Sequence, residues 1–209
     1  MGVRDDQPRR ALAPAMCLDF VNTRYWRGRE TPAETFNAPE DLLAWAVRYA
    51  GAPAQPAPAA LLESGLALRE LLHRIFAARA AGGPVAAADL ADLNAALADA
   101  PSRSGLVVAG EAYAWRTTPG RLASGAAVLL APVLWSAADL LAESGWRQSG
   151  REDGEWAGQA RLRACANPEC RWLFIDASRN GSRRWCDMAA CGNRAKAHRH
   201  YLRVKATKG

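Results

Sequence analysis

The sequence predicts an α+β protein with a mainly helical N-terminal domain that contains a small β element (residues 1–150) and a small C-terminal domain (residues 151–209). Apolar residues recur at helical spacing through most of the N-terminal domain. The stretch 104–115 has a β-type composition instead, and four of the five cysteines follow residue 164. Half of the 209 residues are hydrophobic and 23% are charged, which is a globular composition.

Start and stop signals divide the N-terminal domain into helices. Pro39-Glu40-Asp41 is a typical helix start, and Gly51 is a typical stop. Gly82-Gly83-Pro84 ends a long amphipathic segment. Helices are therefore expected over 16–24, 39–50, 59–81, 86–100 and 122–141, with two short strands around Gly110. Four tryptophans are assigned to core packing: Trp26, Trp45, Trp115 and Trp135.

The apolar segment Leu122–Ala138 is the candidate for a membrane span. It has 17 residues without a charge, which is shorter than a typical span, and it contains Pro132. We expect a buried, kinked core helix. The N-terminus has no apolar stretch of signal-peptide length, so the expected location is the cytoplasm, where thiols stay reduced.

The cysteines of the C-terminal domain form two pairs with equal spacing. Cys165-x4-Cys170 and Cys186-x4-Cys191 are separated by fifteen residues, whereas Cys17 stands alone and reads as a small buried hydrophobe. Two close pairs at this separation are typical of a tetrahedral four-sulfur site. Thiolates suit Zn²⁺, so we expect one structural zinc ion with four cysteine ligands.

The segments around the cysteines predict the order of a treble-clef-like finger. Arg171–Asp176 has strand composition, Asn180-Gly181 favours a tight turn, and Arg183–Cys186 is expected to return as the second strand. Asp187 is placed to cap a helix from Met188 to Lys205.

Other uses of these cysteines fit less well. Two disulfides are disfavoured in a reducing compartment, and redox catalysis calls for a Cys-x-x-Cys pair, which is absent. A catalytic zinc keeps one position open, whereas four cysteines close the shell. His198 and His200 are alternative ligands, but four sulfurs already suffice.

Positive charge is concentrated in the C-terminal region. Residues 161–209 carry twelve Lys/Arg against three Asp/Glu, whereas residues 1–160 carry fifteen against eighteen. This distribution predicts a polyanion partner, and we prefer duplex DNA to RNA because few aromatic residues interleave with the charges. The alternative is a finger that docks an acidic protein. The expected DNA-binding residues are Arg179, Arg183, Arg184, Arg194, Lys196, Arg199, His200 and Arg203.

The segment from Arg163 to Arg203 resembles the CGNR zinc finger, named for the tetrapeptide found here at Cys191–Arg194. The motif MCLDFVNT, beginning at Met16, resembles the opening of the ABATE domain, which accompanies that finger in bacterial proteins. The resemblance implies a stress-related transcription regulator with a DNA-binding finger and a ligand-sensing N-terminal domain.

The polar residues near the N-terminus are the candidates for contact with a small-molecule effector. They are Asp19, Asn22 and Thr23, although a structural role, such as capping or tying the N-terminal helix to the core, is the favoured interpretation. No nucleophile motif, glycine-rich phosphate loop or carboxylate pair is present, so no enzyme activity is expected. The sequence leaves the oligomeric state open.

Overall fold

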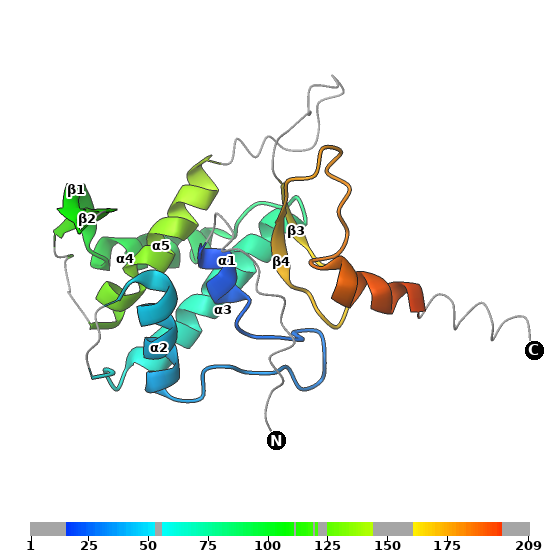
Figure 1. Ribbon diagram of the computed structural model, residues 1–209, viewed down its shortest axis with the longest axis horizontal. Helices are drawn as coiled ribbons and strands as arrows, with labels where there is room; N and C mark the ends of the chain where they lie inside the picture. Colours follow the sequence, from blue (N-terminus) through cyan, green and yellow to red (C-terminus); the bar gives the residue numbers. More distant parts are fainter. Residues whose placement is uncertain are drawn as a thin grey trace, which may run out of the picture.

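The computed structural model describes residues 16–52, 56–110, 112–118, 120, 125–143 and 161–197. Five α-helices, two antiparallel strand pairs and a short π-helix follow one another in this part of the chain (Figure 1). Their bounds are α1 Met16–Val21, α2 Pro39–Ala50, α3 Leu61–Ala80, α4 Ala87–Asp99, β1 Ser102–Ala109, β2 Ala112–Thr118, α5 Gly125–Glu143, β3 Arg161–Ala164, β4 Leu173–Asp176 and η1 Met188–Gly192. The predicted fold class is confirmed.

The helices of the N-terminal region begin and end close to the predicted signals. Pro39 occupies the first turn of α2, and Gly51 ends that helix with φ 66°, a conformation that glycine adopts without strain. The first helix is shorter than expected: it ends at Val21 rather than at residue 24. The domain boundary expected within 145–160 lies outside the described residues.

The helices enclose one apolar core. Phe20 of α1, Phe76 of α3 and Leu134 of α5 are almost fully buried in it. Gly65 lets α2 and α3 approach closely, because a Cβ at this position would lie 2.2 Å from Leu42 Cδ2. Within the described helices, none is long and apolar enough to cross a membrane.

The core extends into the C-terminal region. Leu162 of β3 and Leu173 of β4 are buried in the same apolar cluster as the helices, and β3 packs on α3 (Figure 1). Strands β3 and β4 pair antiparallel, with Ala164 opposite Leu173. The two parts of the chain therefore share their apolar interior.

One predicted strand is wrong. Arg183–Cys186 is irregular, and the partner of β4 is β3, which precedes the first cysteine. The other edge of β4 is occupied by a side chain: Asn22 Nδ2 donates to Leu173 O at 2.8 Å, and Leu173 N donates to Asn22 Oδ1 at 3.0 Å. The amide of Asn22 therefore takes the place of a neighbouring strand.

The buried carboxylate of Asp176 bends the chain that follows β4. It accepts hydrogen bonds from Ser178 N at 3.0 Å and Arg183 N at 2.9 Å, and it pairs with Arg163 Nε at 3.1 Å. These bonds curl residues 177–183 around the carboxylate, so that Arg183–Cys186 cannot run beside β4.

The core assignment of Trp115 is also wrong. This residue lies on the β1–β2 hairpin and is 50% exposed. The two strands around Gly110 form as expected, but among the described residues they pair only with each other and project from α5. Trp26, Trp45 and Trp135 are partly buried and pack against apolar clusters.

A buried charged cluster joins α3 to the segment that follows α1. The Arg69 guanidinium, 1% exposed, donates to Glu34, and Arg27 donates to Glu70 at 2.7 Å. Burial, and to a smaller extent the positive charge of Arg27, lowers the pKa of the neighbouring His73 to about 4. The hydrogen bond from Arg27 and the surrounding guanidinium charges hold the pKa of Glu70 at about 2.

We predict that Asn22→Ala lowers the free energy of unfolding by about 2–3 kcal/mol, because both backbone groups of Leu173 lose their buried partner. Urea denaturation of the zinc-loaded protein measures this loss. Asn94→Ala is the matched control, since Asn94 is exposed on α4 and alanine favours helix there. Equal unfolding midpoints for the two variants would contradict the structural role of Asn22.

We predict that His73 makes the fold acid-sensitive between pH 6.5 and about 4. The unfolded chain takes up this proton at the higher pH and the folded chain only at the lower, so stability falls as the pH falls through this window. Between pH 7.5 and pH 5, the free energy of unfolding of His73→Gln should therefore fall by about 1–2 kcal/mol less than that of the parent protein. Urea midpoints at both pH values test this, and parallel losses in the two proteins would contradict it.

Candidate metal centre

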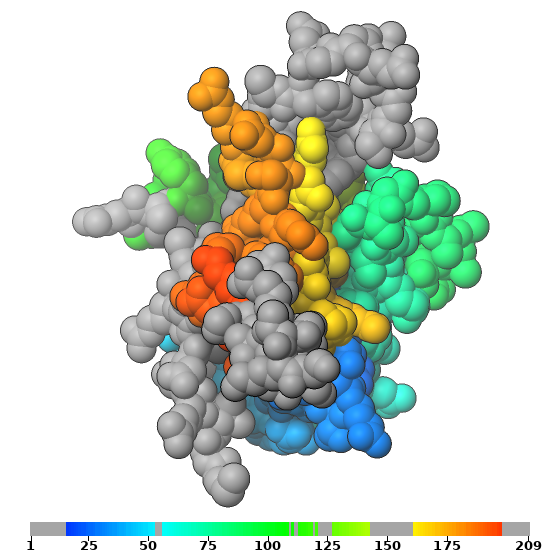
Figure 2. Space-filling model, turned by 90° about the vertical axis from the view of Figure 1, so that its right-hand side faces the viewer, coloured from blue at the N-terminus to red at the C-terminus, as the bar shows by residue number. Residues whose placement is uncertain are grey.

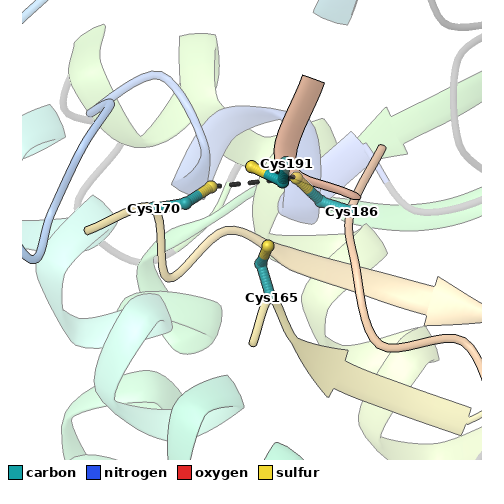
Figure 3. Close-up of side chains that lie close together, drawn as sticks. All are labelled: Cys165, Cys170, Cys186 and Cys191. Atoms are coloured by element: carbon teal, nitrogen blue, oxygen red, sulfur yellow. Dashed lines mark hydrogen bonds between the residues drawn. The ribbon is translucent and has the colours of Figure 1, made fainter. Parts of the chain in front are cut away.

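The four predicted cysteines converge on one point. Their Sγ atoms lie within 4.8 Å of one another, and Figure 3 shows them directed toward a common centre. The Cys170–Cys186 and Cys186–Cys191 sulfur distances are 3.7 and 3.8 Å. A tetrahedron with metal–sulfur bonds of about 2.3 Å has edges of about 3.8 Å. The arrangement therefore fits one tetrahedral Zn²⁺ ion.

Backbone hydrogen bonds hold the two cysteine loops together. In the first loop, Cys170 N donates to Asn167 O at 3.0 Å, and the Asn167 amide lies 3.6 Å from Cys191 Sγ. Ala166 N donates to Arg184 O at 2.8 Å and so joins the first loop to the second. The sulfurs are therefore positioned by the backbone as well as by the metal.

The second loop ends in the predicted helix cap. Asp187 Oδ1 accepts from Ala190 N at 2.7 Å, as the sequence suggested. The first turn, Met188–Gly192, is π-helical and carries Cys191, and an α-helical turn continues to residue 197. The remainder of the helix expected to end at Lys205 lies outside the described residues.

Three of the four thiols compete for one negative charge. The hydrogen bond with Cys170 lowers the pKa of Cys165 to about 2 and raises the pKa of Cys170 to about 12. Hydrogen bonds to Cys165 and Cys170 likewise raise the pKa of Cys186. One thiolate thus forms at the expense of its neighbours, because like charges at this distance repel. A divalent ion removes this penalty and lets all four sulfurs coordinate as thiolates.

The centre is enclosed, as a structural site should be. Each cysteine sulfur belongs to a buried residue, 3–6% exposed, and Phe174 is buried in the same cluster. Three tryptophans pack around it: Trp26, Trp172 and Trp185. Four protein ligands and this aromatic shell leave no position for substrate, so the ion's role is to hold the chain.

The segment that follows α1 lies against the first cysteine loop. Gly28 N donates to Glu169 O at 3.0 Å, and a Cβ at Gly28 would lie 1.7 Å from Pro168 O, so only glycine fits here. The Arg29 and Glu169 side chains form an ion pair at 2.9 Å. Figure 2 shows the yellow and orange surface of the C-terminal domain beside the blue N-terminal segment.

Comparison with known proteins decides the family. Residues 15–144, more than half of the 209-residue chain, match ABATE, described as "Putative stress-induced transcription regulator". The chain belongs to the ABATE family. Residues 161–204 of this ABATE protein match the CGNR zinc finger, so the four cysteines hold a structural zinc ion. A search among curated proteins finds no match.

The basic residues predicted for the ABATE protein's finger fall into three groups. Arg179, Arg184, Arg194 and Lys196 are exposed. Arg183 is half-buried, and its guanidinium donates to Trp185 O at 2.9 Å and to Cys186 O, so this side chain supports the second cysteine loop. The remaining three lie outside the described residues: Arg199, His200 and Arg203.

The three polar residues of the opening ABATE motif occupy different positions. Asn22 and Thr23 are buried, 5% and 6% exposed, whereas Asp19 is half-buried on α1. Asn22 holds β4, and Thr23 Oγ1 donates to Phe20 O at 2.7 Å and accepts from Arg69 Nη1 at 3.2 Å. Sequence reasoning located these residues but missed that Asn22 pairs with a strand 151 positions away.

We predict one zinc ion per chain and its loss in Cys186→Ser, because three thiolates no longer close the shell. Elemental analysis of the purified protein measures the ion, and amide hydrogen exchange measures the opening of residues 161–197. Cys17→Ala is the matched control, since Cys17 is buried between α1 and α5 and should leave the zinc content unchanged. Full zinc content in Cys186→Ser would refute the four-cysteine site.

Proposed function

We propose that this ABATE protein is a zinc-dependent transcription regulator that binds duplex DNA through its C-terminal finger. The observation that carries the proposal is the group of exposed cations in the described part of the finger: Arg179, Arg184, Arg194 and Lys196. They belong to a region with twelve basic and three acidic residues. Such a surplus on one small unit attracts the phosphate backbone.

The finger limits the freedom of two of these arginines. The Arg194 guanidinium lies 4.6 Å from the centre of the Trp26 ring, and Arg184 lies 5.6 Å from that of Trp185. A stacked guanidinium loses less conformational entropy when it contacts a phosphate or a guanine edge. Stacking therefore favours tight contacts with an ordered partner.

The aromatic residues favour duplex over single-stranded nucleic acid as the partner. Trp172 and Trp185 pack against the cysteines, so their rings already serve the metal centre. Binders of single strands need exposed aromatic faces on which bases stack. The finger instead offers charge, which suits a double-stranded backbone.

Contacts between the N-terminal region and the finger suggest how a signal could regulate binding. Asn22 bonds to β4, and Trp26 packs against both the metal centre and Arg194. A small-molecule effector near Asp19, Asn22 and Thr23 stays part of the proposal: a ligand that displaced Asn22 would release β4. The proposal contains no catalytic step. It places the protein in the cytoplasm, where the thiols remain available to zinc.

We predict salt-dependent binding of duplex DNA that weakens in Arg194→Ala and Lys196→Ala. Each variant should reduce the slope of log affinity against log salt by about one, because one phosphate contact is lost. Fluorescence anisotropy with labelled random and genomic duplexes measures the slope. Arg48→Ala is the matched control: it removes the same charge from exposed α2 and should leave the slope unchanged.

Two results would overturn the proposal. The first is no binding to any duplex at low salt by zinc-loaded protein. The second is retention of an acidic protein by the finger in the absence of DNA binding, which would favour a protein-docking role instead.

A further inference from the structure

The β1–β2 hairpin presents an apolar face to water. Leu106 pairs with Trp115 and Val108 with Tyr113, so all four side chains lie on the same face of the two strands. Their exposed fractions are 60% for Leu106, 50% for Trp115 and 75% for both Val108 and Tyr113. Together they expose on the order of 500 Å² of surface, which is the size of the largest apolar patch on a typical monomer, and such patches often have a function.

The base of the hairpin is tied to α5 through the side chain of Arg103. Arg103 forms a two-pronged ion pair with Asp139 of α5 at 2.7 and 2.9 Å. Its guanidinium lies within 5.5 Å of the ring centres of both Trp115 and Trp135. The apolar face is therefore presented on an anchored element.

The hairpin lacks the support that such a sheet needs. A two-stranded sheet is marginally stable in water, and further strands or a covering layer are required to stabilise it. Within the described residues, β1 and β2 pair only with each other, so each has an open edge as well as an exposed apolar face. A second sheet that lies against the hairpin would cover the apolar face and could also bond to an open strand edge.

The charge distribution indicates which partner fits. Residues 102–118 contain only Arg103, Glu111 and Arg116 as charged residues, and Arg103 is paired with Asp139. A nearly neutral surface offers nothing to nucleic acid or to a strongly acidic protein. The same surface suits a second copy of this chain, because two nearly neutral hairpins can pack together without bringing like-charged side chains into contact.

The position of the hairpin also suits self-association. It lies at one end of the molecule's long axis, and the finger lies toward the other (Figure 1). Two chains that meet at their hairpins keep their basic fingers much farther apart than the screening length of about 8 Å at physiological salt. The surplus positive charge of the fingers therefore does not oppose the contact.

We propose that the β1–β2 hairpin is a homodimer interface, in which the faces formed by Leu106, Val108, Tyr113 and Trp115 of two chains pack together about a two-fold axis. A standard interface buries about 800 Å² on each partner. The apolar face supplies more than half of this area, and the hairpin's edges and polar rim supply the rest. The proposal goes beyond DNA binding and holds whether or not DNA is bound.

Sedimentation equilibrium of the zinc-loaded, full-length chain tests the dimer. The parent protein should dimerise, and Val108→Thr/Tyr113→Thr should weaken dimerisation by about tenfold or more, because it removes central apolar contacts. Threonine keeps a high strand propensity, so the hairpin should still form. The matched control is Val47→Thr/Leu90→Gln, which alters exposed apolar residues of α2 and α4 and should dimerise as the parent does.

A second measurement needs no variant. Hydrogen exchange of the parent protein at low and high concentration should show added protection in residues 102–118 at high concentration. A parent protein that stays monomeric up to about 100 µM would overturn the proposal. A dimer that leaves these amides unchanged would overturn it as well.

Discussion

Four sulfur atoms that share one divalent ion are the constraint on which the C-terminal quarter of this structure depends. The sulfurs come from two loops and lie at the edge lengths of a zinc tetrahedron. Strands of four residues and one short helical segment bury too little apolar surface to fold alone. Zinc binding supplies about 10–16 kcal/mol in small finger peptides, which is enough to order such a unit.

The finger nevertheless relies on the helical region as well as on its metal. Asn22 closes the free edge of β4, and Trp26 covers the metal centre from outside the finger's own sequence. The same tryptophan stacks with Arg194, one of the exposed cations of the finger. The metal centre, the N-terminal segment and an exposed cation of the finger are thus physically adjacent.

Local signals in the sequence predicted most of the elements and the metal ligands. Cysteine spacing is a chemical constraint that needs no tertiary information, and the helices begin and end near residues such as Pro39 and Gly51 that act locally. The partner of β4 was missed because Arg161–Ala164 is short, although Leu162 between two arginines shows the alternation of a half-buried strand. The decisive contact, from Asn22 to Leu173, spans 151 residues and has no local signature.

The exposure of Trp115 and the structural use of Arg183 were missed for a related reason. Residue type indicates the average environment of a side chain, and tryptophan is usually covered whereas arginine is usually solvated. At these two positions the tertiary structure overrides the average. The hairpin carries Trp115 away from the core, and the second cysteine loop uses Arg183 to satisfy its carbonyl groups.

The shared core has a consequence for biosynthesis. Leu162 and Leu173 complete an apolar cluster whose other members all belong to the first 143 residues or to the same strand pair. A ribosome makes the helices first, and domains generally fold in the order of their synthesis. Here the nascent helical region emerges with one side of its interior uncovered, and that side closes only when the last quarter of the chain has been released and has captured its ion.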